Sequence, residues 1–89
     1  MMYSLVYART CRSQIHSLHP QLKPVVKKRI EELKSNPYKG KPLERELSGF
    51  YSYRARRFRI IYKIDPENKT VMIYHVGHRK DIYEMLAES

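Results

Sequence analysis

Residues 50–63 read FYSYRARRFRIIYK, and two kinds of side chain alternate along this stretch. In residues 50–56, tyrosines and alanine fall on one face of an extended chain, with serine and arginines on the other. In residues 57–64, phenylalanine, isoleucine and tyrosine alternate against arginine, isoleucine and lysine. A period of two is the pattern of a strand that is buried on one face. The stretch therefore predicts two strands joined by a hairpin at Arg56 and Arg57.

Two further strands are expected outside this hairpin. Residues 65–69 (DPENK) have the composition of a turn, and residues 70–76 (TVMIYHV) are rich in β-branched and aromatic side chains. Residues 2–7 (MYSLVY) have the same strand-like character. The sequence thus predicts one strand at the start of the chain and three in its second half.

Helices are expected between and after these strands. Apolar residues in 9–18 lie at helical spacing, and Pro20 separates this run from a second one at 22–34. Pro24 suits the first turn of the second helix, which Ser35-Asn36-Pro37 should end. Residues 37–49 read as a loop, and Ile82, Met85 and Leu86 predict a short helix after Gly77. The expected fold is α+β with the order β-α-α-β-β-β-α, a helical hairpin packed on a four-stranded, mostly antiparallel sheet.

Length, cysteine content and hydropathy restrict the class of protein. A chain of 89 residues is expected to form a single domain spanning 1–89. Cys11 is the only cysteine, which excludes an intrachain disulfide and a CxxC-type zinc site. No stretch approaches the ~20 apolar residues of a membrane span, and no signal peptide is recognisable. We expect a cytoplasmic protein of a prokaryotic-type cell with no membrane partner.

The charge balance favours an anionic partner. The net charge is +9, and residues 47–64 carry five basic side chains and no acidic one. Arg54 and Arg59 should lie on neighbouring strands, on the face opposite the apolar side chains. Guanidinium groups match phosphate oxygens, which favours a nucleic acid. The alternatives are a solvated outer sheet face and a charge that serves solubility only.

The segment Gly77-His78-Arg79-Lys80-Asp81-Ile82-Tyr83 supplies proton-transfer candidates. In a helix, Arg79 and Tyr83 would share one face, and a tyrosine beside arginines can transfer a proton during attack by a ribose 2′-hydroxyl. The alternative is that Tyr83 packs with its apolar neighbours. His78 follows Gly77 at the expected strand end, and its imidazole is a second acid or base candidate. Glu44 and Glu46 can reach the site as a base, although an ion pair with Lys41 or Arg45 is the simpler reading.

No cofactor or metal site is expected, because no histidine pair has ligand spacing with a third partner. His75 is expected in or beside the core, and His16 and His19 on the surface. Tyr51, Tyr53, Phe58 and Tyr62 are expected to pack rather than to stack on bases.

Several blocks of the chain resemble RelE/ParE-superfamily toxins of toxin–antitoxin pairs. They are the leading strand, the segment "LKSNPYKGKPL", the block "LSGFYSYRARRFRIIYKI" and the terminal "VGHRKDIYEML". The resemblance covers nearly the whole length and implies a fold similar to small microbial ribonucleases. RelE-type members cleave mRNA in the ribosomal A site without a metal.

The resemblance also implies roles for individual residues. Arg54, Arg59 and Arg79 would bind the scissile phosphate, and Tyr83 would act as general acid or base. The neighbouring groups predicted to bind RNA are Arg56, Arg57, Lys63, His78 and Lys80.

Two departures from relatives affect these implications. Many relatives carry a lysine where this chain has Ser52, which leaves the general base open. The hairpin turn has Arg56-Arg57 where relatives have a glycine-containing turn, so this turn should be strained, bulged or shifted.

Three functions from different classes follow. The leading one is a ribosome-dependent endoribonuclease, neutralised by a cognate antitoxin that is acidic and partly disordered when free. The second is a ParE-like inhibitor of DNA gyrase. The third is a non-catalytic RNA-binding module.

Overall fold

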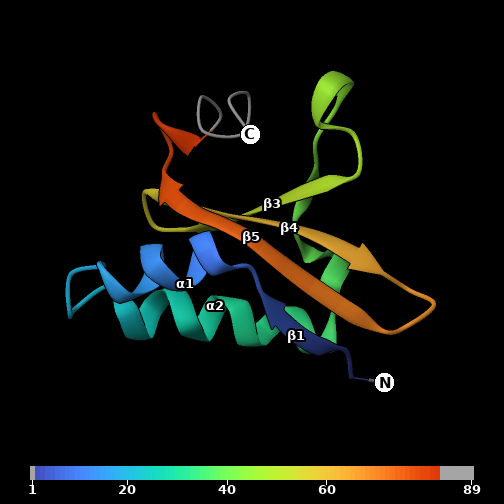
Figure 1. The fold of residues 1–89 in the computed structure, drawn as a ribbon, viewed down its shortest axis with the longest axis horizontal. Coiled ribbons are helices and arrows are strands. Elements are labelled where there is room, and N and C mark those ends of the chain that lie inside the picture. Colours follow the sequence, from blue (N-terminus) through green and yellow to red (C-terminus); the bar gives the residue numbers. More distant parts are fainter. Residues whose placement is uncertain (1, 83–89) are drawn as a thin grey trace.

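The structure is a computed structural model that describes residues 2–82, and Figure 1 shows a sheet with two helices on one side. The elements in chain order are β1 (Ser4–Tyr7), α1 (Arg9–His16), α2 (Lys23–Ser35), the 3-10 turn η1 (Pro37–Lys39), β2 (Lys41–Pro42), the 3-10 turn η2 (Arg45–Leu47), β3 (Phe50–Ala55), β4 (Phe58–Asp65) and β5 (Thr70–His78). The α+β class is confirmed. The helix expected after Gly77 lies mostly outside the described residues.

Within residues 2–82 the sheet has five strands in the order β1-β5-β4-β3-β2, so the predicted count of four is wrong. β1 runs parallel to β5, and the other pairs are antiparallel, as expected for a mostly antiparallel sheet. The additional strand is β2, where Lys41 pairs with Ser52 of β3 at the sheet edge. Two residues in a proline- and glycine-rich stretch show no alternation, so the sequence carried no signal for this strand.

The two helices cover one face of the sheet. Figure 1 shows α1 and α2 side by side and running in opposite directions, which confirms the helical hairpin. α1 ends at His16, two residues before the predicted limit, and α2 carries Pro24 in its first turn. Neither helix, nor any other in residues 2–82, has the length and apolar character to cross a membrane.

The core lies between the helices and the sheet. It contains Ile30 and Leu33 of α2 and Ile60 and Tyr62 of β4, all fully buried. The other three aromatic residues expected to pack do so: Tyr51, Tyr53 and Phe58 lie partly buried against this core.

The hydroxyl of Tyr62 donates to the carbonyl of Pro37 at 2.7 Å and accepts from the Gly40 amide at 3.0 Å. This ring therefore ties the loop after α2 to the sheet and brings residues 41–42 alongside β3.

A smaller apolar cluster lies on the outer face of the sheet, the face away from the helices. Ile61 and Ile82 are fully buried there, with Leu43, Leu47 and Phe50 packed against them. Leu43 and Leu47 thus anchor the long loop on the face opposite the helices.

A β-bulge in β5 sets the position of the strand end. Ile61 pairs with His75 whereas Tyr62 pairs with Ile73, so Tyr74 is an additional residue in β5. The inward positions are consequently Val71 and Ile73 before the bulge and Val76 after it. β5 then continues to His78, and Gly77 lies opposite Arg59.

Candidate nucleic-acid site

The strand ends and the β3–β4 turn form a basic cavity of about 450 Å³. We call it the arginine basin. Among the described residues, its lining contains six basic side chains and one histidine: Arg54, Arg56, Arg57, Arg59, Lys80, Arg79 and His78. The structure therefore brings together three of the four predicted catalytic residues and four of the five predicted RNA-binding residues. The fourth catalytic residue, Tyr83, lies outside the described part of the chain.

The register of the sheet places the first two arginines side by side. Arg54 of β3 is paired with Arg59 of β4, and Arg59 is paired with Gly77 of β5. All three positions therefore belong to the outer face, and the glycine adds no side chain to the space beside the guanidinium groups. A hydrogen bond of 3.0 Å from the Arg79 amide to the Arg57 carbonyl holds the segment after β5 against the turn.

The turn itself adopts an unusual backbone conformation. Arg56 has a φ of +57°, a left-handed value that a side chain disfavours and glycine tolerates. Ala55 pairs directly with Phe58, so the loop contains only Arg56 and Arg57. The side-chain Nε of Arg54 donates to the Arg56 carbonyl at 2.9 Å, which supports this conformation. The prediction of an unusual turn is confirmed.

No acidic side chain from residues 2–82 lines the basin. Glu44 and Glu46 are exposed on and beside η2 and are absent from its lining. The expected ion pair of these glutamates with Lys41 or Arg45 is wrong, because in the described part of the chain neither carboxylate lies at ion-pair distance from a basic group. The basin thus concentrates positive charge without compensation from a described carboxylate.

His78 is held in a defined orientation. The Lys80 amide donates to its Nδ1 at 3.2 Å, and the ring meets Phe58 edge-on with 5.9 Å between centroids. An Nδ1 that accepts a hydrogen bond leaves Nε2 as the nitrogen that carries the proton in the neutral ring. His78 therefore presents one proton-bearing nitrogen for contact with a ligand of the basin.

The remaining predicted residues lie apart from the basin. Lys63 is on the same sheet face, but its Nζ lies 4.5 Å from the centroid of the Phe50 ring and 5.8 Å from that of Tyr74. His75 is half-buried, its Nδ1 has no hydrogen-bond partner among the described residues, and burial lowers the pKa of its imidazole. Among residues 2–82, no three His, Cys, Asp or Glu side chains are grouped so that they could hold a metal ion.

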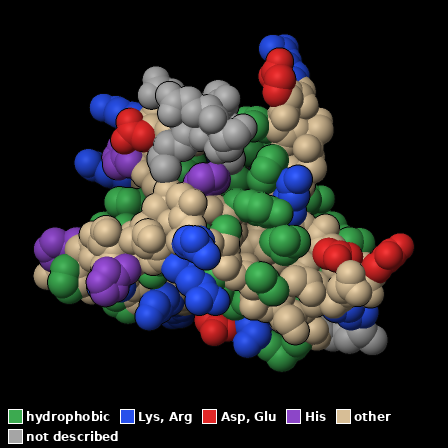
Figure 2. Space-filling model, in the orientation of Figure 1, with side chains coloured by type: hydrophobic (Ala, Val, Ile, Leu, Met, Phe, Trp, Pro, Cys, Tyr) green, Lys and Arg blue, Asp and Glu red, His purple; other side chains and the backbone are tan. Residues whose placement is uncertain are grey.

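A second basic cavity was not expected from the sequence. It lies between the helices, and His16, expected on the surface, is exposed and lines it. In Figure 2, Lys and Arg side chains also gather over the region of α1 and α2. The available signal was basic residues four positions apart on both helices, which is also the pattern of a solvated helix face.

Comparisons with known proteins identify relatives of this chain. Residues 6–83 match the sequence model of the family described as ParE toxin of type II toxin-antitoxin system, parDE. The chain is 42% identical over 85 residues to Toxin RelG of Mycobacterium tuberculosis (strain ATCC 25618 / H37Rv), covering 93% of this chain and 98% of the relative. It is 39% identical over 54 residues to Toxin RelE of the same organism, covering 60% of this chain and 56% of that protein.

Solved structures show the same architecture. The RelBE2 toxin–antitoxin complex from Mycobacterium tuberculosis contains a chain with a TM-score of 0.82 and 37% identity, covering 89% of this chain and all of that one (100%). The isolated E. coli RelE toxin has a TM-score of 0.74 at 20% identity, covering 97% of this chain and 96% of that one, a likeness of fold alone. With the family match across most of its length, this chain belongs to the RelE/ParE superfamily as a toxin of a type II toxin–antitoxin system.

Proposed function

We propose that this toxin is a ribosome-dependent endoribonuclease that cleaves translated mRNA in the A site. The observation that carries the proposal is the arginine basin, in which guanidinium groups from β3, from β4 and from the segment after β5 line one cavity of about 450 Å³. A phosphodiester carries the charge and the oxygen geometry that such a group of arginines binds best.

The reaction is an in-line attack that needs no metal. The ribose 2′-oxygen forms a bond to the adjacent phosphorus, and the bond from phosphorus to the 5′-oxygen of the next nucleotide breaks. A base takes the proton of the 2′-hydroxyl, and an acid protonates the leaving 5′-oxygen. The products are a 2′,3′-cyclic phosphate and a 5′-hydroxyl. Arg54, Arg59 and Arg79 would stabilise the additional negative charge at the transition state, which is usually the largest contribution in such chemistry.

Two groups are assigned to the proton transfers. The resemblance to RelE-type toxins gives Tyr83 the role of general acid or base. The structure supports His78 as a second group, because it lines the basin with its Nδ1 occupied by the Lys80 amide. Arg56, Arg57 and Lys80 would bind flanking phosphates, since they line the same cavity.

The partners follow from the family and the charge. Relatives of known structure include the intact E. coli RelBE toxin–antitoxin complex. We propose that a cognate antitoxin, acidic and partly disordered when free, covers the arginine basin of this toxin. The target would be mRNA on the ribosome, which places the action of the toxin in the cytoplasm.

A ParE-like inhibitor of DNA gyrase is the second candidate, because the family whose model matches this chain is described as ParE toxin. The basin favours the nuclease, since gyrase inhibition requires no phosphodiester to be cut. A non-catalytic RNA-binding module would use the same arginines without a proton-transfer group.

Mapping of mRNA ends by primer extension after brief expression tests the proposal. Wild type should produce new 5′ ends within translated messages, and Arg79→Ala or Tyr83→Phe should abolish them. Arg29→Ala is the matched control, because it also removes one charge but lies on α2, paired with Glu32 at 3.7 Å. Intact mRNA together with growth arrest and DNA-damage signalling would support gyrase inhibition instead. Intact mRNA with retained RNA binding would support the non-catalytic module.

A further inference from the structure

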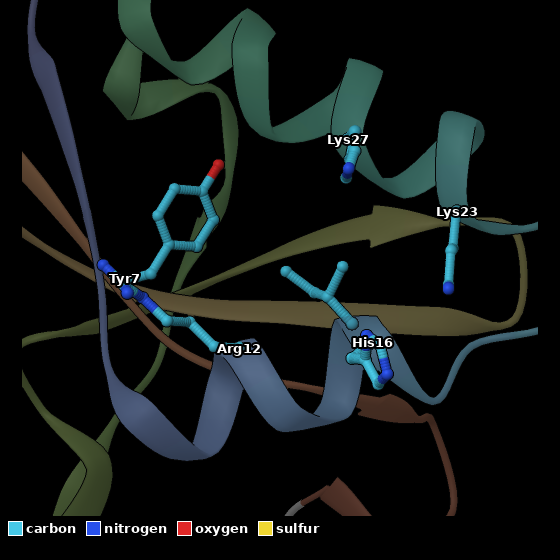
Figure 3. Close-up of a pocket in the computed structure, with 6 residues that line it drawn as sticks. Tyr7, Arg12, His16, Lys23 and Lys27 are labelled. Atoms are coloured by element: carbon cyan, nitrogen blue, oxygen red, sulfur yellow. The ribbon is translucent and has the colours of Figure 1, made fainter.

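A second cavity of about 340 Å³ opens between α1, α2 and the end of β1. It is lined by Tyr7, Arg12, Ile15, His16, Lys23 and Lys27, and Figure 3 shows the Tyr7 ring between the two helices. We call it the helix pocket. It shares no lining residue with the arginine basin and lies on the helix-covered side of the sheet. Its volume is within the ~300–1,000 Å³ range of small-ligand pockets.

The basic side chains of the helix pocket have no carboxylate partner among the described residues. Arg12 and His16 are four residues apart on α1, as Lys23 and Lys27 are on α2, so each helix presents a pair on one face. Within residues 2–82, no carboxylate lies at ion-pair distance from any of these four. The second half of α2 differs, because Arg29 and Lys34 pair with Glu32 and Glu31. Within the described residues, the basic side chains around the pocket are therefore not neutralised by ion pairs.

The start of α2 strengthens this excess. Lys23 begins the helix, and its first turn contains no acidic residue. The amino end of a helix carries partial positive charge, which disfavours a lysine there and favours an anion. A bound anion would relieve the repulsion among the lysines and the helix end together.

Tyr7 and Ile15 give the pocket a neutral part. Ile15 is only 8% exposed, and Tyr7 is partly buried against the core. Burial, followed by the nearby charge of Glu31, raises the pKa of the Tyr7 phenol, so its hydroxyl stays a hydrogen-bond donor. That hydroxyl has no partner among the described residues and points toward α2 in Figure 3. The Tyr7 ring beside basic side chains suits a ligand that has an anionic group and a planar ring.

From this arrangement we propose that the helix pocket binds a phosphate group, held by Lys23 and Lys27. The phosphate belongs either to inorganic phosphate or to a nucleotide whose base contacts the Tyr7 ring. The proposal is independent of the cleavage reaction, because none of these residues lines the arginine basin.

The test is a residue-resolved NMR titration of the full chain with inorganic phosphate and, separately, with adenosine monophosphate, at constant ionic strength. Amide signals of Tyr7, Ile15 and Lys27 should shift and saturate. Lys23→Ala/Lys27→Ala should weaken binding about tenfold or more, since charge-assisted hydrogen bonds are lost. Lys28→Ala is the control, because it removes a charge beside Lys27 but does not line the pocket.

The outcomes separate the possibilities. Tighter binding of adenosine monophosphate, with contacts between its base and the Tyr7 ring, supports a nucleotide. Equal affinity for both probes supports a bare phosphate group. Shifts confined to signals of the arginine basin would overturn the proposal, as would an equal loss of affinity in Lys28→Ala, which indicates general attraction to the net charge.

Discussion

Arg56 occupies a backbone position that glycine would fill with less strain. Its φ of +57° lies in the left-handed region, and its carbonyl accepts the hydrogen bond from Arg54. Because Arg56 keeps a disfavoured conformation while lining the arginine basin, we infer that its side chain matters more than local stability.

Replacing this residue tests that view. Arg56→Gly should stabilise the fold by up to about 1 kcal/mol, because the strain is removed. Arg57→Gly should destabilise it by about 0.5–1 kcal/mol, since Arg57 has no positive φ and only the entropic cost of glycine remains. Urea unfolding of both variants measures the difference. Equal effects of the two substitutions would contradict the interpretation.

The hydroxyl oxygen of Tyr62 is a polar atom buried in the protein interior. Its side chain is fully buried, its hydroxyl bonds both Pro37 and Gly40, and burial raises its pKa to about 12. A Cβ added at Gly40 would collide with this hydroxyl, so the glycine is required by the close approach.

Tyr62→Phe should cost about 1–3 kcal/mol, because a buried amide and a buried carbonyl lose their partner. Thermal unfolding of this variant should be compared with Tyr53→Phe, whose hydroxyl bond to Glu32 is only partly buried and whose loss should cost less. A larger loss in Tyr53→Phe would show that the Tyr62 contacts contribute little.

At the scale of elements, Glu32 joins α2 to β3 and to η1. Its Oε1 accepts from the Tyr53 hydroxyl at 2.6 Å and from Lys39 Nζ at 3.2 Å, with Arg29 at 3.7 Å. The hydrogen bond from Tyr53 is the main cause that lowers the pKa of Glu32 below 4.5. One carboxylate thus connects the helix layer to β3 of the sheet.

The lowered pKa predicts a pH dependence. The folded state favours the charged carboxylate, so its contribution is complete above pH 4.5 and is lost as pH falls through the folded pKa. Wild type should be more stable than Glu32→Gln at neutral pH, and the difference should disappear in acid. Urea unfolding at several pH values measures it. A difference that stays constant with pH would exclude the charge as its cause.

Arg54 and Arg59 should contribute differently to the stability of the β3–β4 hairpin. Arg59→Ala should leave the melting temperature unchanged or raise it, because it removes a like charge from a crowded surface. Arg54→Ala should lower it slightly, because the hydrogen bond to the turn carbonyl is lost. Differential scanning calorimetry distinguishes the two. A large drop for Arg59→Ala would show that this arginine is structural.

At the scale of the whole molecule, the net charge is +9, and a basic cavity lies on each side of the sheet. The outer face carries the arginine basin, and the helix side carries the helix pocket. Charge distributed in this way should make binding of any polyanion strongly dependent on salt.

An RNA made uncleavable by 2′-deoxy substitution provides the measurement. With three arginines on phosphates, the logarithm of the association constant should fall against the logarithm of salt concentration with a slope of about −2. Arg59→Ala should reduce this slope by about 0.7, and Arg29→Ala should leave it unchanged. The proposed phosphate contacts would be refuted by equal slopes in all three proteins.

Local pattern predicted much of this molecule. The alternation in residues 50–63 places Tyr53, Phe58 and Tyr62 on the core face. An arginine rather than a glycine at position 56 predicts the unusual turn. Arg54 and Arg59 were expected on neighbouring strands, and the register pairs them directly. These features depend on residues close in sequence, so periodicity and turn chemistry are enough to predict them.

The sequence by itself determined the α+β class, the core face of β3 and β4 and the basic character of the outer face. Only the tertiary structure decided which cations share a cavity, because β2, the bulge at Tyr74 and the packing of α1 against α2 depend on contacts between distant segments. The bulge shows the reason most directly. One additional residue in β5 changes which side chains face the core, and pairing with β4, not local propensity, determines where it lies.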